Sequence, residues 1–261
     1  QPMFDKTGRY IIIYNGEIYN FKEFYDELLG DGVKFNSNSD TEVILYLYIK
    51  YGDDFIKKLI GMFSIVIYDV KDQKIKVFID RAGVKPFYYY FKNGLFAFAS
   101  ELKSFFCIKE IDKKIDPNAL GLYFQYSYIP APYSIFENIH KLPAGNMLEF
   151  DLRSMSYTKK QYWSVEEYYN KEKTGKEYEV IKKEVSELLL SAFKYRLVSD
   201  VPVGIFLSGG YDSSAVAAIL QSNSSVKLKT FSIGFDNKNF DEAPYAKDIA
   251  NFLNKEHYEY Y

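Results

Sequence analysis

A glycine- and serine-rich turn between an apolar run and a helix-like run is the feature that most constrains this chain. The turn occupies residues 208–214, with the sequence Ser-Gly-Gly-Tyr-Asp-Ser-Ser, and follows the apolar residues 203–207. A buried strand, a glycine turn and a helix start together suit anion binding, because the first N–H groups of a helix point toward the ligand. Gly209 and Gly210 allow the backbone to approach an anion closely. We therefore predict a phosphate site in an α/β unit.

The polar side chains of this turn support the same interpretation. Ser208, Ser213 and Ser214 add hydroxyl donors, and Asp212 is its one acid. A lone carboxylate would repel phosphate, so Asp212 predicts a bridging Mg²⁺. The turn lacks the lysine of a G-x-x-x-x-G-K-[ST] loop. An ordinary strand-to-helix turn is the alternative, because glycine and serine are common in turns.

Length and composition indicate a soluble globular protein with one large domain or two ordinary ones. The chain has 261 residues, of which 48% are hydrophobic and 26% are charged. Its formal net charge of −2 gives no electrostatic case for nucleic-acid binding, and no apolar stretch is long enough to cross a membrane. The single cysteine, Cys107, excludes an internal disulfide and favours the cytoplasm. Composition leaves the oligomeric state, including a homodimer, open.

The order of predicted elements indicates two domains of different class. The first, residues 1–165, is expected to be α+β. A capping box at residues 39–42 opens a helix that ends near Tyr51. Residues 166–178 are polar and are predicted to be a linker. From residue 179 onward a helix precedes alternating strands and helices, which is typical of a parallel sheet. The predicted strands are residues 9–14, 62–68, 74–79, 87–91, 95–99, 146–151, 203–207, 229–234 and 257–261, and the later helices are 179–198, 213–221 and 242–253.

A second motif, Asn-Gly-Glu-Ile-Tyr-Asn, occupies residues 15–20. Alone it predicts a tight hairpin turn, because Asn-Gly favours one. Further segments follow it in a fixed order, at residues 39–40, 61–64, 80–89 and 99–103. This series resembles the glutaminase domain of the glutamine-hydrolysing asparagine synthetases, which are N-terminal-nucleophile amidotransferases. The resemblance to these enzymes continues through residues 142–145, 199–204, 208–214 and 231–235. Residues 208–214 resemble the pyrophosphate loop of the N-type ATP pyrophosphatases. Several motifs in order are more specific than any one of them.

The resemblance implies the fold of both domains. Residues 1–165 would form an αββα glutaminase sandwich, and residues 179–261 would begin an α/β parallel-sheet ATP-pyrophosphatase domain. Both are expected to be incomplete, so that the chain is a fragment. The family's nucleophile is a cysteine at the mature N-terminus, which would precede Gln1. Cys107 lies in an apolar run, and we expect it to be inert packing rather than a substitute.

The resemblance also implies roles for four residues of the glutaminase domain. The side-chain amide of Asn15 and the backbone N–H of Gly16 would stabilise the oxyanion formed when glutamine is attacked. Glu17 and Asp40 would hold the α-amino group of glutamine, because a cation in a cleft needs carboxylate partners. For Asp40 the alternative is a plain helix N-cap.

In the second domain the resemblance implies an ATP site. Leu207 and Ile233 would line the adenosine pocket, with ordinary buried strand residues as the alternative. Asp212 would also bind Mg²⁺. The residues implied to hold pyrophosphate are Ser208, Gly209, Gly210, Asp212, Ser213 and Ser214.

The implied reaction is the ATP-dependent conversion of aspartate to asparagine. An acyl-adenylate forms, pyrophosphate leaves, and ammonia released from glutamine passes through a tunnel and displaces AMP. A related amidotransferase acting on a sugar or natural-product carboxylate, or a non-catalytic relative, is the alternative. The aromatic series Tyr123, Phe124, Tyr126 and Tyr128 is expected to pack in a core or an interface.

Overall fold

The computed structural model describes residues 1–199, 201–223, 228–254 and 256–261. The chain divides into two compact units, Gln1–Glu172 and Lys173–Tyr261. The division falls inside residues 166–178, where the sequence predicts a linker. The domain boundaries given above stay a prediction.

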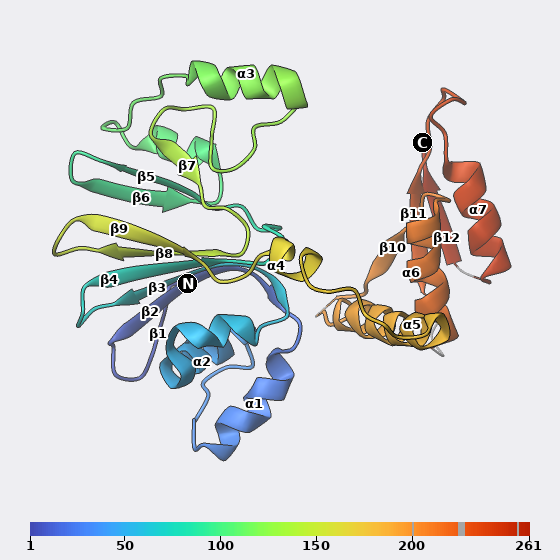
Figure 1. Ribbon diagram of the computed structural model, residues 1–261, viewed down its shortest axis with the longest axis horizontal. Helices are drawn as coiled ribbons and strands as arrows, with labels where there is room; N and C mark the ends of the chain where they lie inside the picture. The colour runs from blue at the N-terminus through green and yellow to red at the C-terminus, as the bar shows by residue number, and fades with distance from the viewer. Residues whose placement is uncertain (200, 224–227, 255) are drawn as a thin grey trace. The chain divides into compact units, whose positions relative to one another are not determined.

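The first unit contains two antiparallel sheets (Figure 1). The larger sheet has six strands in the order β1-β2-β3-β4-β8-β9, and the smaller has three in the order β6-β5-β7. The strands are β1 (Met3–Phe4), β2 (Tyr10–Ile18), β3 (Gly61–Asp69), β4 (Lys74–Ile79), β5 (Tyr88–Lys92), β6 (Leu95–Ala99), β7 (Ile139–Lys141), β8 (Asn146–Asp151) and β9 (Ser156–Gln161).

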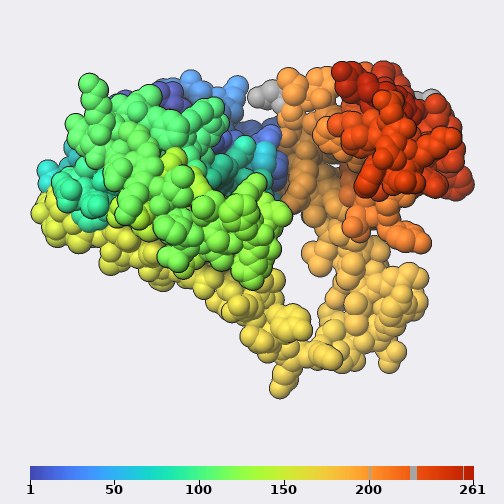
Figure 2. All heavy atoms as spheres, turned by 90° about the horizontal axis from the view of Figure 1, so that it is seen from above, coloured from blue at the N-terminus to red at the C-terminus, as the bar shows by residue number. Residues whose placement is uncertain are grey.

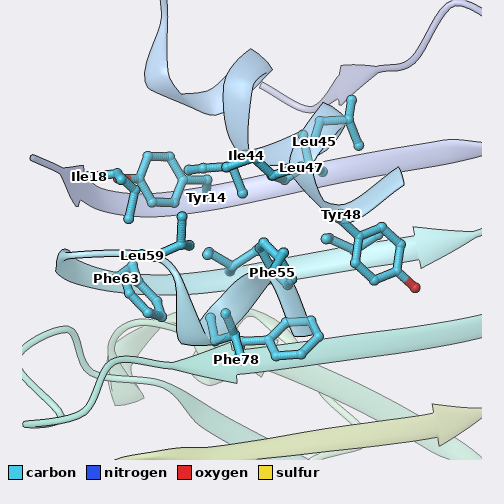
Figure 3. Close-up of a cluster of buried hydrophobic side chains, with 14 of the residues drawn as sticks. Tyr14, Ile18, Ile44, Leu45, Leu47, Tyr48, Phe55, Leu59, Phe63 and Phe78 are labelled. Carbon is cyan, nitrogen blue, oxygen red and sulfur yellow. The ribbon is translucent and has the colours of Figure 1, made fainter. Parts of the chain in front are cut away.

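Helices cover the outer faces of both sheets. On the larger sheet lie α1 (Phe21–Gly30), α2 (Asp40–Tyr51) and the 3₁₀ helix η1 (Gly52–Lys57); beyond the smaller sheet lie the 3₁₀ helix η2 (Leu102–Cys107) and α3 (Pro117–Tyr126) (Figure 1). A short helix, α4 (Val165–Tyr169), follows β9. Three buried clusters separate the layers. In the first, Leu47 of α2 and Phe55 of η1 lie over Phe78 of β4 (Figure 3). The predicted α+β class, with αββα layers, is confirmed.

The start of α2 shows a local departure from the predicted capping box. Ser39 is the N-cap, and its hydroxyl accepts the N–H of Thr41 at 3.2 Å. The carboxylate of Glu42 does not bond back to Ser39. It accepts the N–H groups of Asn36 and Ser37, at 2.9 and 2.8 Å, because the preceding loop folds over it. The helix therefore begins where predicted, but Glu42 fixes the loop instead of closing the box.

The second unit is a small α/β fold. Its parallel sheet has the order β10-β11-β12, and the helix-facing core contains Leu207, Ala217, Ala246 and Ala250. This alternation of strands and helices matches the prediction. The elements are α5 (Tyr178–Tyr195), β10 (Gly204–Phe206), α6 (Tyr211–Ser222), β11 (Lys229–Ile233), α7 (Ala243–Phe252) and β12 (Glu256–Tyr260).

Two predictions of buried side chains in the first unit meet exposed ones. Cys107 is exposed at the end of η2, because the apolar run around it turns only Phe105 inward. Tyr123, Phe124 and Tyr126 are exposed on α3, so they belong to no core, and their packing in an interface stays a prediction. Figure 2 shows the segment that contains α3, in green, at the surface of the first unit. Within the residues that the structure describes, no helix combines the length and apolar character needed to cross a membrane.

Candidate functional site

Asn15 and Gly16 lie within β2, so the hairpin-turn alternative is wrong. They pair with Ser64 and Phe63 of β3 in a register that is uninterrupted from one end of β2 to the other. At Gly16 the two backbones come very close. A Cβ on Gly16 would lie 2.2 Å from the carbonyl oxygen of Met62. The glycine is therefore required by the approach of a neighbouring strand rather than by a turn.

The N–H group of Gly16 points away from β3. Hydrogen bonds alternate along an antiparallel pair. The Tyr19 N–H donates to the Ile60 carbonyl at 2.8 Å, so the backbone N–H and C=O groups of the odd-numbered residues of β2 point toward β3. The backbone groups of the even-numbered residues point to the opposite side. The Tyr14 N–H donates to the Gln1 side-chain oxygen at 2.6 Å, and the Ile18 N–H donates to Asp40 Oδ2 at 3.1 Å. The Gly16 N–H lies between these two donors.

The side chain of Asn15 lines a cavity of about 540 Å³. Its Nδ2 donates to the hydroxyl of Ser100 at 3.1 Å. Ser100 follows β6 and lines the same cavity, together with Phe87, which precedes β5, and Phe98 of β6. Ser100 has no role in the sequence-based prediction, because its only signal is membership of the motif at residues 99–103. The structure therefore adds Ser100 to the surroundings of Asn15.

Asp40 is held beside β2 by two hydrogen bonds. Its Oδ2 accepts the hydroxyl of Tyr14 at 2.8 Å and the N–H of Ile18 at 3.1 Å. Because Ser39 is the N-cap, the alternative role of Asp40 as a plain N-cap is wrong. Burial raises the pKa of the Tyr14 hydroxyl above its ordinary value, and the charges of Asp40 and Glu17 raise it further. Both predicted carboxylates thus act on one buried hydroxyl.

In the second unit, the turn at residues 208–214 joins β10 to α6. Gly210 is the N-cap of α6, and no side chain caps the helix. The first N–H groups of α6 are therefore left for a ligand, as anion binding requires. The hydroxyls of Ser208 and Ser213 bond to each other at 3.0 Å, and Ser214 Oγ donates to the Gly210 carbonyl at 2.6 Å.

The two glycines of this turn are not equivalent. Gly209 has φ +85°, and a Cβ there would lie 2.7 Å from the Cβ of Tyr245 on α7. Gly210 has φ −73°, and a Cβ there would meet only the Ser208 hydroxyl, at an ordinary 3.4 Å. Only Gly209 is required by conformation and packing.

A cavity of about 300 Å³ adjoins the turn and is lined by Leu207, Ser208 and Ile233, among others. Leu207 is buried, as the strand alternative expected, whereas Ile233 is 56% exposed at the end of β11. Ser232, which the sequence did not single out, donates its hydroxyl to the Leu207 carbonyl at 2.5 Å. The ends of β10 and β11 therefore form one wall of this cavity.

Asp212 stands in the first turn of α6 and is exposed. Across the described part of the chain, no three or more His, Cys, Asp or Glu side chains gather as metal ligands. Mg²⁺ commonly binds one or two carboxylates and takes its remaining ligands from water and phosphate. Asp212 fits that pattern only if a phosphate supplies the other oxygens.

The geometry of both units agrees with two family matches. Residues 1–163 match the glutamine amidotransferase domain, and residues 184–261 match asparagine synthase. The chain belongs to the glutamine amidotransferase family. The resemblance seen in its motifs is thereby confirmed.

Relatives of this amidotransferase chain carry asparagine synthetase names. A protein of Methanocaldococcus jannaschii, provisionally named asparagine synthetase [glutamine-hydrolyzing] 2, is 44% identical over 96% of this chain and 48% of its own length. Asparagine synthetase [glutamine-hydrolyzing] 1 of Bacillus subtilis is 36% identical over 97% of this chain and 39% of its own. The chain thus spans about half the length, or less, of these curated relatives.

Among solved structures, the glutamine phosphoribosylpyrophosphate amidotransferase from B. subtilis, complexed with ADP and GMP, covers 100% of this chain and 48% of its own. The TM-score is 0.44 and the identity 16%. The fold of this amidotransferase chain rests on its own sheets and helices.

Proposed function

We propose that the chain is part of a carbon–nitrogen ligase that uses glutamine and ATP to convert aspartate to asparagine through an acyl-adenylate, with release of AMP and pyrophosphate. The observation that carries this proposal is the order of the two family matches, a glutamine amidotransferase domain followed by asparagine synthase, in one polypeptide. Such an order suits an enzyme that releases ammonia in one domain and activates a carboxylate in the next. The cytoplasm is the proposed compartment, since the chain has a single cysteine.

In the first unit the proposed chemistry is hydrolysis of the glutamine side-chain amide. The Gly16 N–H and the Asn15 amide would donate to the developing oxyanion, and loss of one such donor typically costs about 3–4 kcal/mol of transition-state stabilisation. Glu17 and Asp40 would bind the α-amino group. The Tyr14 hydroxyl, which donates to Asp40 at 2.8 Å, would keep that carboxylate oriented.

The attacking thiolate in this proposal belongs to a cysteine outside the 261 residues. Cys107 does not suit the role. It is exposed at the end of η2 and is not among the residues that line the cavity of Asn15. A nucleophile must reach the carbonyl carbon whose oxygen the Asn15 and Gly16 donors bind.

In the second unit the proposed chemistry is attack of a carboxylate on the α-phosphorus of ATP. The uncapped N-terminus of α6 would receive the pyrophosphate end of the nucleotide, with hydrogen bonds from Ser208, Ser213 and Ser214. Bound Mg²⁺, held by Asp212 and the phosphates, would neutralise charge on the leaving group. Leu207 and Ile233 would contact the adenosine.

Calorimetric titration of the chain with Mg·ATP tests the nucleotide site. We expect Asp212→Asn to weaken Mg·ATP binding at least about tenfold, or about 1.4 kcal/mol. Asp248→Asn is the matched control, because Asp248 is also an exposed helical aspartate, on α7. No affinity of the folded chain for Mg·ATP, or equal affinity in both variants, would refute the site.

The acceptor is tested in the full-length enzyme. We expect pyrophosphate release to depend on aspartate and to remain at background with sugar acids or other carboxylates. Release that responds to another carboxylate but not to aspartate would exclude asparagine synthesis while leaving the nucleotide site intact.

A further inference from the structure

A second cavity of the first unit, of about 410 Å³, shares only Phe87 with the lining of the Asn15 cavity and carries positive charge. Its walls come from four segments: the turn after β4, the start of β5, residues 128–131 after α3, and the end of β7 with the turn that follows. Among the described residues that line it, the charged ones are Lys85 and Lys141, with no carboxylate. A cavity lined by cations alone is an electrostatic site for an anion.

Lys141 is the more constrained of the two lysines. It is half-buried, and its Nζ donates to the Ile129 carbonyl at 2.5 Å. Its Nζ also lies 5.9 Å from the centre of the Tyr88 ring. An ammonium group has three donors, so the carbonyl satisfies only one. Burial lowers the pKa of Lys141, and no carboxylate among the described residues opposes that shift.

A partly desolvated ammonium without a counter-ion is unfavourable unless a ligand supplies the opposite charge. Two other half-buried lysines, Lys74 and Lys76, pair with carboxylates: Lys74 with Glu149 at 2.6 Å and Lys76 with Asp53 at 2.7 Å. Lys141 has no such pair among the described residues. An anion in the cavity would give it one.

The walls around Lys85 are fixed by backbone hydrogen bonds. The buried carboxylate of Asp80 accepts the N–H groups of Ala82, Val84 and Lys85, at 3.1, 2.9 and 3.0 Å. On the facing wall, the Leu142 N–H donates to the Phe87 carbonyl at 3.1 Å. The cavity is therefore shaped before a ligand arrives, which lowers the entropic cost of binding.

We propose that this cavity binds a small organic carboxylate, with its charged end at Lys141 and Lys85. Phe87, Leu142 and Ile129 give the rest of the cavity apolar walls, which suit a short carbon chain. The lining has no arginine fork and no helix N-terminus, which recognise phosphate by geometry, so phosphate would bind the two lysines through charge alone and gain nothing from the apolar walls. The proposal is independent of the reaction assigned above.

Calorimetric titration of the folded chain with glutarate tests the proposal. Glutarate has no α-amino group, so the carboxylates Glu17 and Asp40 would not recruit it. We expect the wild-type chain to bind glutarate, and Lys141→Met to weaken binding at least tenfold. Glutaramide, the neutral analogue, should not bind.

Lys113→Met is the matched control. The Nζ of Lys113 also donates to a backbone carbonyl, that of Ile108 at 3.1 Å, and Lys113 is not among the residues lining this cavity. We expect its affinity for glutarate to stay within twofold of wild type. If Lys141→Met shows no cooperative thermal unfolding, and so is not folded, Lys85→Met replaces it as the test. Lys85→Met should weaken glutarate binding at least threefold. Unchanged affinity in the folded lysine variants, no binding by the wild-type chain, or binding of inorganic phosphate in preference to glutarate would each overturn the proposal.

Discussion

Replacing Gly16 by alanine should destabilise the first unit strongly. The added Cβ would lie 2.2 Å from the Met62 carbonyl oxygen and 2.7 Å from the Phe63 Cα. Both contacts are with backbone, so no side-chain rotation relieves them and β2 must separate from β3. Overpacking a core typically costs about 1–3 kcal/mol and occasionally more. Because a whole strand pair must move here, we expect a loss of about 3 kcal/mol or more.

The assay is urea unfolding followed by tryptophan fluorescence. The chain has one tryptophan, Trp163, which belongs to the first unit. Its backbone N–H donates to the Gly145 carbonyl at 3.2 Å. Its fluorescence therefore reports this unit separately from the second. With a urea slope of about 2 kcal/mol per molar, a loss of 3 kcal/mol lowers the midpoint by about 1.5 M.

Gly121→Ala is the control for this prediction. Gly121 lies inside α3, and a Cβ there would meet nothing within 4 Å. Alanine is favoured over glycine in a helix interior by about 0.5–1 kcal/mol, so this variant should be slightly more stable than wild type. A Gly16→Ala chain that unfolds within 0.5 M of wild type would refute the argument that backbone contact requires glycine at this position.

Three further predictions concern the two units separately. Gly209→Ala should destabilise the second unit by about 1–3 kcal/mol, since Gly209 has φ +85° and faces Tyr245. Loss of helical circular dichroism on heating measures this destabilisation, and Gly210→Ala should cost clearly less. Tyr14→Phe should cost about 1.5–3 kcal/mol, because it removes a hydrogen bond to the Asp40 carboxylate; an unchanged urea midpoint would speak against that bond. The pKa of Asp69 is lowered because, although burial opposes it, hydrogen bonds from Arg9 and from backbone N–H groups outweigh burial. Its contribution to stability is therefore present above its ordinary value of 3.8 and is lost as the pH falls through its lower folded value, so Asp69→Asn should flatten the acid end of the stability curve.

Much of the fold could be predicted from local patterns. Strands at residues 74–79, 95–99 and 146–151 have the predicted bounds, because short runs rich in apolar residues lie there between clear turns. The sequence also predicts the alternation of strands and helices in the second unit. Asn15-Gly16 was ambiguous, since the same dipeptide suits a tight turn and a close strand contact. Only the pairing of Gly16 with Phe63 resolves it.

The surroundings of the candidate sites could be predicted less well. The bond between Asn15 and Ser100 joins residues 85 positions apart, and no local pattern encodes it. The same is true of Tyr14 and Asp40. Glycine at positions 209 and 210 looked equivalent in the sequence, but the requirement at Gly209 comes from α7, which is distant in the chain. The exposure of Cys107 likewise depends on which residues of η2 turn inward. The roles given to the site residues stay predictions.

The mutual hydrogen bond of Ser208 and Ser213 has a consequence for selectivity. Each hydroxyl has a partner at 3.0 Å, so an ion that binds these serines must replace the hydrogen bond between them. Chloride, with one centre of charge, would break these contacts and restore few of them. A chain of phosphoryl groups presents many oxygens and could engage both serines and the helix start at once. The loop would thereby rank anions by how many acceptors they offer, and abundant simple salts would compete poorly for it.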